Sequence, residues 1–287
     1  MKIGLTAYFC KCINPLQMNN FWQRVLTGIL FVIVVAGGVF YHPFSFFAVF
    51  FLVVIAGIYE LNGLLEAAQI KTNFLSALSI GVFVYVVSFL TQSGISHFSV
   101  FYLLIPIVSL VFIKELFDMD DKPLERIGSS LLCAVYVGVP LAMLNVLAFA
   151  DGVYRFELPL AVFILVWIND TGAYLSGVTI GKHKFFERIS PKKTWEGTIG
   201  GFLLTLIGGY VISLFWKDLN MLQWMTLGGI VSIMAVLGDL IESLFKRSIG
   251  IKDSGNVFPG HGGILDRFDA VIFAIPMAVF YIEVIVR

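Results

Sequence analysis

Residues 222–245 read LQWMTLGGIVSIMAVLGDLIESLF, a nearly unbroken apolar run with two acidic residues close to its end. A helix that crosses a bilayer needs roughly 20 mostly apolar residues, so this stretch is long enough to span. Asp239 lies seven residues before Lys246, which is about 10 Å along a helix. An ionisable side chain inside a span is energetically unfavourable and marks a functional site by default. The stretch therefore predicts a membrane helix that carries chemistry.

The whole chain has the composition of a membrane protein. Of its 287 residues, 59% are hydrophobic and 13% are charged, whereas a soluble domain is about 45–50% apolar and about 25% charged. A single core cannot bury this excess, so apolar surface must face lipid. The formal net charge is +0, and without a strong basic field we expect no nucleic-acid partner.

We expect an all-α integral membrane protein with about nine transmembrane helices. The expected spans are residues 25–41, 44–61, 72–90, 98–114, 128–149, 157–180, 197–215, 222–245 and 268–286. The expected regions are an N-terminal cytoplasmic extension (1–24), N-terminal transmembrane helices (25–155) and a C-terminal catalytic transmembrane region (156–287). The start of the chain is not typical of a signal peptide, and Met18 is an alternative start. No internal repeat is apparent.

The basic residues segregate strongly between the loops. Sixteen of the 19 lysines and arginines fall on one side of these spans, and only Arg155, Lys217 and Arg287 fall on the other. Because positive residues mark the cytoplasmic face, we expect the N-terminus in the cytoplasm and the C-terminus outside. The two basic loops at residues 181–201 and 246–269 would then face the cytoplasm.

Polar residues inside the spans point to a cavity that opens toward this face. Asp170, in the segment VWINDTGAYLSG (166–177), lies about 16 Å from the end of its span. Asp239, Glu242, Ser243 and Lys246 follow at i, i+3, i+4 and i+7, so they share one helical stripe. Such a stripe must face protein or water. The alternative for Glu242 and Lys246 is an interfacial helix end whose side chains snorkel.

The loop 246–269 mixes acidic, basic and glycine residues. Asp266 and Asp269 are three apart, so both can join Asp239 as oxygen ligands of a hard cation such as Mg²⁺. Gly262 and Gly263 let backbone N–H groups approach an anion, and the lysines and arginines offer charge-assisted bonds to phosphate. A basic loop that binds anionic lipid head groups is the alternative, but it does not explain the interspersed aspartates.

The other basic loop carries SPKKTWEG at residues 190–197 and leads directly into the seventh span. Lys192 and Lys193 present point charges suited to phosphate. A helix that begins near Thr194 would add the positive end of its dipole. An ordinary cytoplasmic loop is the equally open alternative.

From Ser243 through Asp269 the chain resembles the signature of the phosphatidate cytidylyltransferase (CDP-diacylglycerol synthase) family. That signature reads S-x-x-K-R-x4-K-D, then x5-P-x-H-G-G-x-x-D-R-x-D, and every fixed position is matched here. The segments NDTGAYLSG (169–177) and 190–197 are also similar, so the resemblance covers roughly residues 165–270.

The resemblance implies a dimeric enzyme of a bacterial cell (inner) membrane that needs Mg²⁺, is helped by K⁺, and faces the cytoplasm. Its substrates would be CTP and phosphatidate, and its products CDP-diacylglycerol and pyrophosphate. By similarity, Asp239 and Asp266 are the foremost metal ligands, followed by Asp269 and Asp170.

The remaining roles follow from the same resemblance and from the charge of the substrates. The expected catalytic residues are Asp239, Asp266, Lys246, Arg267 and His261. The residues expected to bind the nucleotide are Lys192, Lys193, Ser243, Arg247, Lys252, Gly262 and Gly263. Two other functions stay open at this point. A CTP-dependent polyprenol kinase would release CDP instead of pyrophosphate. A cation-coupled transporter would also use carboxylates inside the membrane, although the missing repeat argues against it.

Overall fold

The computed structural model describes residues 20–118, 121–150, 152–251, 254–255 and 262–287. Several predictions fall on other residues and so lie outside the described part. These are the start at Met18, most of the extension 1–24, and two of the site residues, Lys252 and His261.

The first half of the chain is helical. Its elements are α1 (Asn20–Tyr41), α2 (Pro43–Ala67), α3 (Phe74–Gln92), η1 (Phe98–Leu103), α4 (Leu104–Phe117), α5 (Pro123–Cys133), η2 (Ala134–Gly138) and α6 (Val139–Ala148). The last three form one continuous rod, in which η2 is a short π-helical segment.

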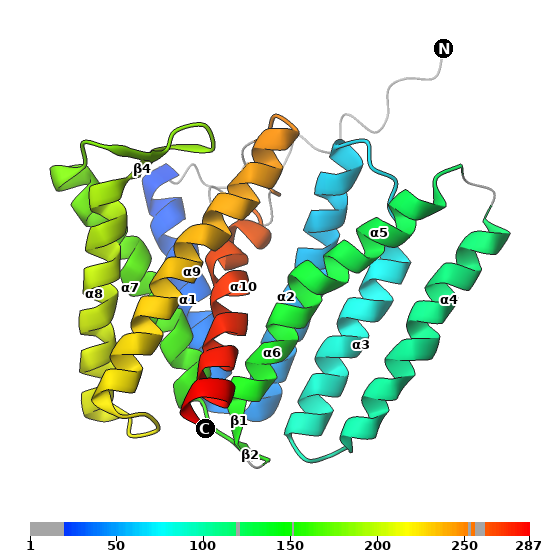
Figure 1. Cartoon of the computed structure of the whole chain (residues 1–287), viewed down its shortest axis with the longest axis horizontal. Helices are drawn as coiled ribbons and strands as arrows, with labels where there is room; N and C mark the ends of the chain where they lie inside the picture. Colours follow the sequence, from blue (N-terminus) through cyan, green and yellow to red (C-terminus); the bar gives the residue numbers. More distant parts are fainter. Residues whose placement is uncertain (1–19, 119–120, 151, 252–253, 256–261) are drawn as a thin grey trace.

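The second half adds four more helices and two short antiparallel hairpins. Its elements are β1 (Phe149–Ala150), β2 (Val153–Tyr154), α7 (Glu157–Ile180), β3 (Lys184–Phe186), β4 (Ser190–Thr194), α8 (Trp195–Phe215), α9 (Met221–Ser248), α10 (Leu265–Phe280) and η3 (Tyr281–Val286). Strand β1 pairs with β2 and β3 with β4, and the second hairpin covers the end of the bundle near α8 and α9 (Figure 1).

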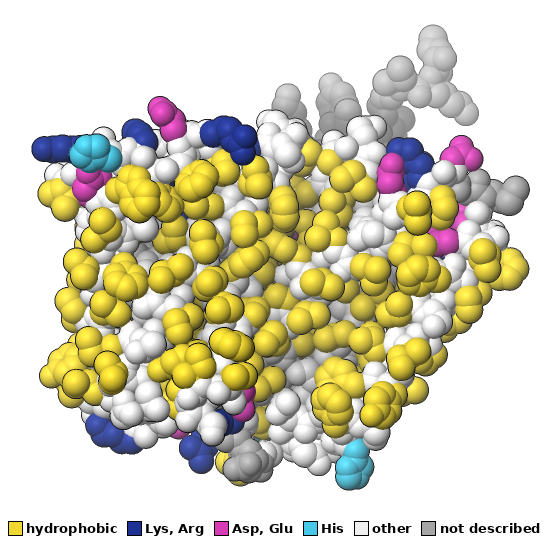
Figure 2. Space-filling model, in the orientation of Figure 1, with side chains coloured by type: hydrophobic (Ala, Val, Ile, Leu, Met, Phe, Trp, Pro, Cys, Tyr) yellow, Lys and Arg dark blue, Asp and Glu magenta, His cyan; other side chains and the backbone are white. Residues whose placement is uncertain are grey.

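Within the described residues, eight helical segments are long and apolar enough to cross a membrane, and Val25–Tyr41 of α1 is a shorter apolar helix. Hydrophobic side chains form a broad band between two charged edges of the molecule (Figure 2). The predicted all-α, multi-pass membrane fold is confirmed. The count of nine spans, the orientation of the termini and the three predicted regions stay predictions.

Polar side chains at the helix starts explain several boundaries. Thr194 caps α8, because its Oγ1 accepts a hydrogen bond from the Gly197 N–H at 3.1 Å. Asn73 caps α3 by accepting from the Ser76 N–H. Such caps satisfy donors that a helix start leaves unpaired. The helix start predicted near Thr194 is therefore confirmed.

Aromatic packing places α10 in the middle of the bundle. The ring centroids of Phe50 (α2) and Phe163 (α7) lie 5.6 Å apart, and Phe268 (α10) lies 6.2 Å from Phe163. All three side chains are almost fully buried. On its other side α10 packs against α9 (Figure 1). The N-terminal end of α10, the C-terminal end of α9 and the β3–β4 hairpin consequently meet at one end of the molecule.

Candidate active site

Three carboxylates from two helices meet at this end of the bundle. Asp239 and Glu242 of α9 and Asp269 of α10 each offer an oxygen atom, and these atoms lie within 4.8 Å of one another. Glu242 is fully buried, whereas Asp239 and Asp269 are partly exposed. We call these three residues the carboxylate triad.

A glycine lets the two helices approach closely beside the triad. A Cβ atom at Gly238 would collide with the backbone oxygen of Asp269 and would lie 3.2 Å from the Ala270 Cα. Small residues permit such backbone contacts between membrane helices. The Ala270 N–H donates to the Asp269 carboxylate at 2.6 Å. The close approach therefore presents Asp239 and Asp269 to each other across the helix interface.

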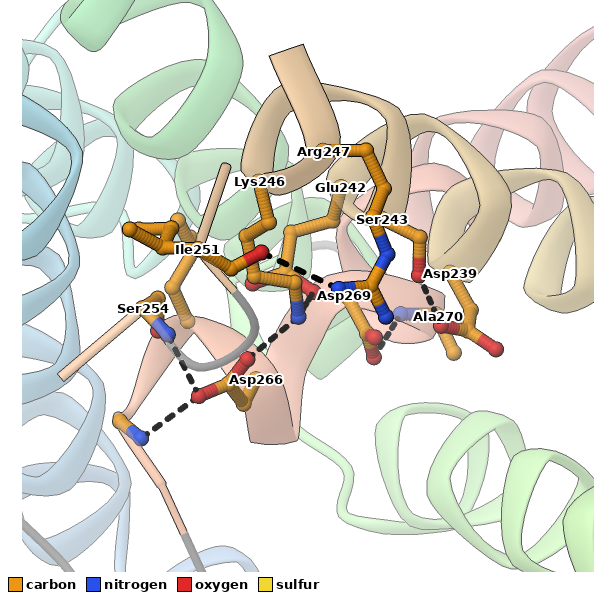
Figure 3. A network of polar contacts seen from close by, with 12 residues as sticks. Asp239, Glu242, Ser243, Lys246, Arg247, Ile251, Ser254, Asp266, Asp269 and Ala270 are labelled. Carbon is orange, nitrogen blue, oxygen red and sulfur yellow. Dashed lines mark hydrogen bonds and ion pairs between the residues drawn. The ribbon is translucent and has the colours of Figure 1, made fainter. Parts of the chain in front are cut away.

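Lys246 lies between two acidic side chains and is itself buried (Figure 3). Its Nζ is 2.6 Å from Glu242 Oε2 and 2.5 Å from Asp266 Oδ1. The stripe predicted on α9 does face the protein interior, and the snorkelling alternative is wrong for Glu242 and Lys246. A lysine has three donor hydrogens, of which these contacts use two, so a direct bond from Lys246 to phosphate stays a prediction.

Asp266 is held by the protein on both of its oxygens. Besides Lys246 on Oδ1, its Oδ2 accepts from the Ser254 N–H at 3.0 Å and from the Gly263 N–H at 2.7 Å. Among the described residues, the triad includes Glu242 and not Asp266. The metal-binding role of Asp266 stays a prediction, and the geometry adds Glu242 as a candidate that the predicted ligand set lacked.

A cavity of about 230 Å³ opens beside the triad. Asp170, Asp266, Arg267 and Asp269 line it, together with apolar side chains of α1 and α7. Asp170 shares this space with Asp266 and Asp269, whereas Asp239, which was predicted to open into the same cavity as Asp170, does not line it. Asn169 donates to Asp170 at 3.3 Å. Asp269 thus connects the cavity to the triad.

The β3–β4 hairpin brings a lysine to the triad. Lys193 Nζ lies 2.5 Å from Asp239 Oδ2, while Lys192 is exposed next to it. Ser243 Oγ lies 3.3 Å from Asp239 Oδ1. The predicted nucleotide contacts of these three side chains stay predictions, but the structure brings the hairpin and the stripe on α9 together.

Arg247 links two loops through their backbones. Its guanidinium donates to Ile189 O of the hairpin at 3.5 Å and to Ile251 O at 3.2 Å. Gly262 has a φ of +82°, in the left-handed region that glycine adopts without strain. The phosphate contacts predicted for Arg247, Gly262, Gly263 and Arg267 stay predictions.

The triad fits a divalent cation on two grounds. Glu242 Oε1 is buried and has no hydrogen-bond partner among the described residues. Buried carboxylate oxygens are rarely left without a partner. Among the described residues, the acidic side chains of the site also outnumber the basic ones: Asp170, Asp239, Glu242, Asp266 and Asp269 face Lys193, Lys246, Arg247 and Arg267. Three carboxylates with a surplus of negative charge are a donor set suited to Mg²⁺.

Sequence comparison identifies the family. Residues 22–285 match the cytidylyltransferase family. The chain belongs to this family. It is 52% identical over 120 residues to phosphatidate cytidylyltransferase of Staphylococcus aureus (strain COL), which covers 41% of this chain and 46% of the relative. It is 46% identical over 149 residues to the protein of the same name from Staphylococcus haemolyticus (strain JCSC1435), covering 51% and 55%. The chain therefore spans about half the length of the curated relatives it matches.

Two acidic residues near the site were not among the predicted site residues. Glu242 carried a usable signal, because it lies three residues after Asp239 on the same stripe. Glu60 of α2 carried a weaker signal, because it is an acid inside the predicted span 44–61 but lies outside the region of resemblance. Its carboxylate accepts from the Ile264 and Leu265 N–H groups at the start of α10. The first half of this family member thus reaches the site as well.

Proposed function

We propose that this protein transfers the cytidylyl group of CTP to phosphatidate, forming CDP-diacylglycerol and pyrophosphate. The observation that carries the proposal is the carboxylate triad, whose buried Glu242 oxygen lacks a hydrogen-bond partner in the described structure. The triad lies at one end of a bundle of membrane helices, where a water-soluble nucleotide and a membrane lipid can both arrive. The name and similarity of the staphylococcal relatives support the same reaction.

Asp239, Glu242 and Asp269 would hold Mg²⁺. When bound, Mg²⁺ supplies neutralisation of the triphosphate charge and alignment of the attacking and leaving oxygens. We also propose that K⁺ stimulates the reaction, as the family resemblance implies.

The reaction needs no strong base, because the phosphate of phosphatidate is already an anion. One of its oxygens attacks the α-phosphorus of CTP, and the bond from that phosphorus to the bridging oxygen of the β-phosphate breaks. Pyrophosphate leaves with the electron pair. The residues of the chain must therefore bring two polyanions together and stabilise the charge that develops on the leaving group.

Basic side chains around the triad are suited to this task. Lys193 stands on the hairpin beside Asp239, and Arg267 lines the cavity that Asp170 and Asp269 share. We assign the hairpin side to the nucleotide phosphates and the cavity to the lipid phosphate. Phe31 and Val32 of α1 also line the cavity, so acyl chains can approach it along an apolar wall.

The location and assembly of the enzyme are part of the same proposal. The basic loops would face the cytoplasm, where CTP is found, and the enzyme would lie in a bacterial inner membrane as a homodimer. The segregation of lysine and arginine between loops supports this orientation.

The test uses purified protein, CTP labelled in the cytidine, phosphatidate and Mg²⁺. We expect a lipid-soluble cytidine product and an equal amount of pyrophosphate. Release of CDP with a phosphorylated lipid would identify a polyprenol kinase instead. Ion flux into liposomes without nucleotide, together with no lipid product, would identify a transporter.

Variants make the test specific to the site. Asp266→Asn is expected to abolish the product while the protein still inserts into the membrane. The matched control is Asp218→Asn, which changes an aspartate near the opposite end of the bundle, where it pairs with Arg155 at 3.3 Å. Near-normal activity of Asp266→Asn would remove Asp266 from the site.

A further inference from the structure

A buried acidic side chain from the first half of the chain contacts the loop before α10. Glu60 lies on α2 and is only 5% exposed. Its Oε1 accepts from the Ile264 N–H and its Oε2 from the Leu265 N–H, both at 2.8 Å. Its Oε2 also accepts from Ser254 Oγ at 3.1 Å. The carboxylate therefore caps the start of α10, although 204 residues separate Glu60 from Ile264.

The charge of Glu60 suits this position. The first N–H groups of a helix have no partner within the helix, and the N-terminal end of the helix dipole is positive. A carboxylate placed there is stabilising on both grounds. The cap comes from another helix, so it fixes the position of α10 relative to α2 as well as its first turn.

The loop before α10 is shaped to accept Glu60. A Cβ atom at Gly263 would collide with Glu60 Oε2 and Ser254 Oγ. A Cβ atom at Gly255 would lie 2.7 Å from Glu60 Oε1. These two glycines therefore leave space for the carboxylate, which explains Gly263 without any contact to phosphate.

A continuous path of polar contacts leads from Glu60 to the carboxylate triad. Ser254 donates through its hydroxyl to Glu60 and through its backbone N–H to Asp266. Asp266 pairs with Lys246, and Lys246 pairs with Glu242 of the triad. Asp269, another triad member, lies one turn after Asp266 on the helix that Glu60 caps.

We propose that Glu60 is a positioning residue for catalysis: it caps α10 so that Asp266 and Asp269 are held in register with Asp239 and Glu242 of α9. The catalytic consequence rests on the proposed cytidylyl transfer, whereas the cap itself does not.

The first experiment tests the cap directly, without any assay of activity. Hydrogen–deuterium exchange of the purified protein is measured on peptides that contain Ile264 and Leu265. In Glu60→Ala both amides lose their acceptor and are expected to exchange faster. In Glu60→Gln only one oxygen can accept, so an intermediate increase is expected. Unchanged exchange at these amides in Glu60→Ala would show that Glu60 does not cap α10.

The matched control is Glu115→Gln on α4. Glu115 is also a buried acid of the first half, but among the described residues its polar partners are Arg126 at 3.3 Å and Asn73, which lie outside α10. It is expected to leave exchange at residues 264–265 and the turnover number unchanged. Thermal unfolding of all variants in detergent shows whether any loss reflects a general failure to fold.

The second experiment tests the effect on catalysis. Residues that hold metal ligands in position typically contribute about 10–100-fold. Because Glu60 acts on Asp269 through the helix that it caps, kcat of Glu60→Ala is expected to fall by roughly the lower end of that range, about 10-fold, with a higher Mg²⁺ concentration for half-maximal rate. The KM for phosphatidate should change little, and Glu60→Gln should recover part of kcat. If the wild-type protein makes no CDP-diacylglycerol, the proposed function is wrong. The exchange experiment still shows, independently of that result, whether Glu60 caps α10. If exchange rises but kcat stays normal, the positioning role is overturned.

Gly263 provides an independent test of the same contact. Gly263→Ala should lower kcat strongly in wild type but much less in Glu60→Ala, because removing the carboxylate creates space for the added methyl group. Coupling of this kind is expected for residues in direct contact. Fully additive losses would show that Gly263 is required for another reason.

Discussion

Replacing Lys246 distinguishes two roles for this side chain. The structure places its ammonium group 2.6 Å from Glu242 and 2.5 Å from Asp266, whose side chains are 0% and 9% exposed. Lys246→Met removes the charge but keeps much of the apolar stem. Two buried carboxylates then lack their cation, and breaking a buried ion pair typically costs about 3–5 kcal/mol.

The expected result is a large loss of stability in the absence of any substrate. For a chain of roughly this size, each kcal/mol lowers the unfolding temperature by about 2–4 °C, so Lys246→Met should lower it by roughly 6–20 °C. Thermal unfolding in a mild detergent is the assay. The control is Lys184→Met on β3, an exposed lysine, for which a change within about 0.5 kcal/mol is expected.

The double variant Lys246→Met with Glu242→Gln sharpens the test. It removes the positive charge together with one of the negative charges it balances, so part of the lost stability should return. A role of Lys246 confined to binding CTP predicts the opposite pattern. In that case Lys246→Met would weaken nucleotide binding and leave the unfolding temperature of the free protein unchanged, which would refute the reasoning.

Three further variants probe the neighbours of the triad. Asp170→Ala should reduce cytidylyl transfer measurably, and activity equal to wild type would remove Asp170 from the catalytic cavity. Lys193→Met breaks a partly exposed pair with Asp239, so it should change stability by less than about 1 kcal/mol while lowering kcat/KM for CTP. Gly238→Ala should force α9 and α10 apart and destabilise the protein by about 1–3 kcal/mol, seen as a lower unfolding temperature. Gly63→Ala, where a Cβ atom meets nothing within 4 Å, is its control, and equal effects of the two substitutions would contradict the close contact at Gly238.

Hydropathy predicted the helices well, because a long apolar run in a membrane protein is compatible with few structures other than a spanning helix. The predicted spans correspond to the helices of the structure, with boundaries that differ by a few residues. The largest difference is in α2, which was expected to end at residue 61 and continues to Ala67. Glu60 and Asn62 interrupt the apolar pattern there, but both are buried against protein. The two hairpins were not expected, because each strand has only two to five residues.

The site was predictable where its geometry follows from one helix. The spacing of Asp239, Glu242 and Lys246 placed them on a single stripe, and the structure brings them together. Contacts between helices were not predictable in this way. Asp266 and Asp269 are both possible ligands by spacing, and only the structure shows that Asp266 also pairs with Lys246. Glu60 illustrates the same limit, because its partners lie some 200 residues away.

The most direct test of the metal site is a structure of the protein with Mn²⁺ and CTP, recorded with the anomalous signal of manganese. We predict a peak within coordination distance, about 2–2.5 Å, of carboxylate oxygens of Asp239, Glu242 and Asp269, with the triphosphate beside it. The same peak should be absent in Glu242→Gln with Asp269→Asn. A manganese ion bound elsewhere with CTP, and no density between these three side chains, would contradict the account.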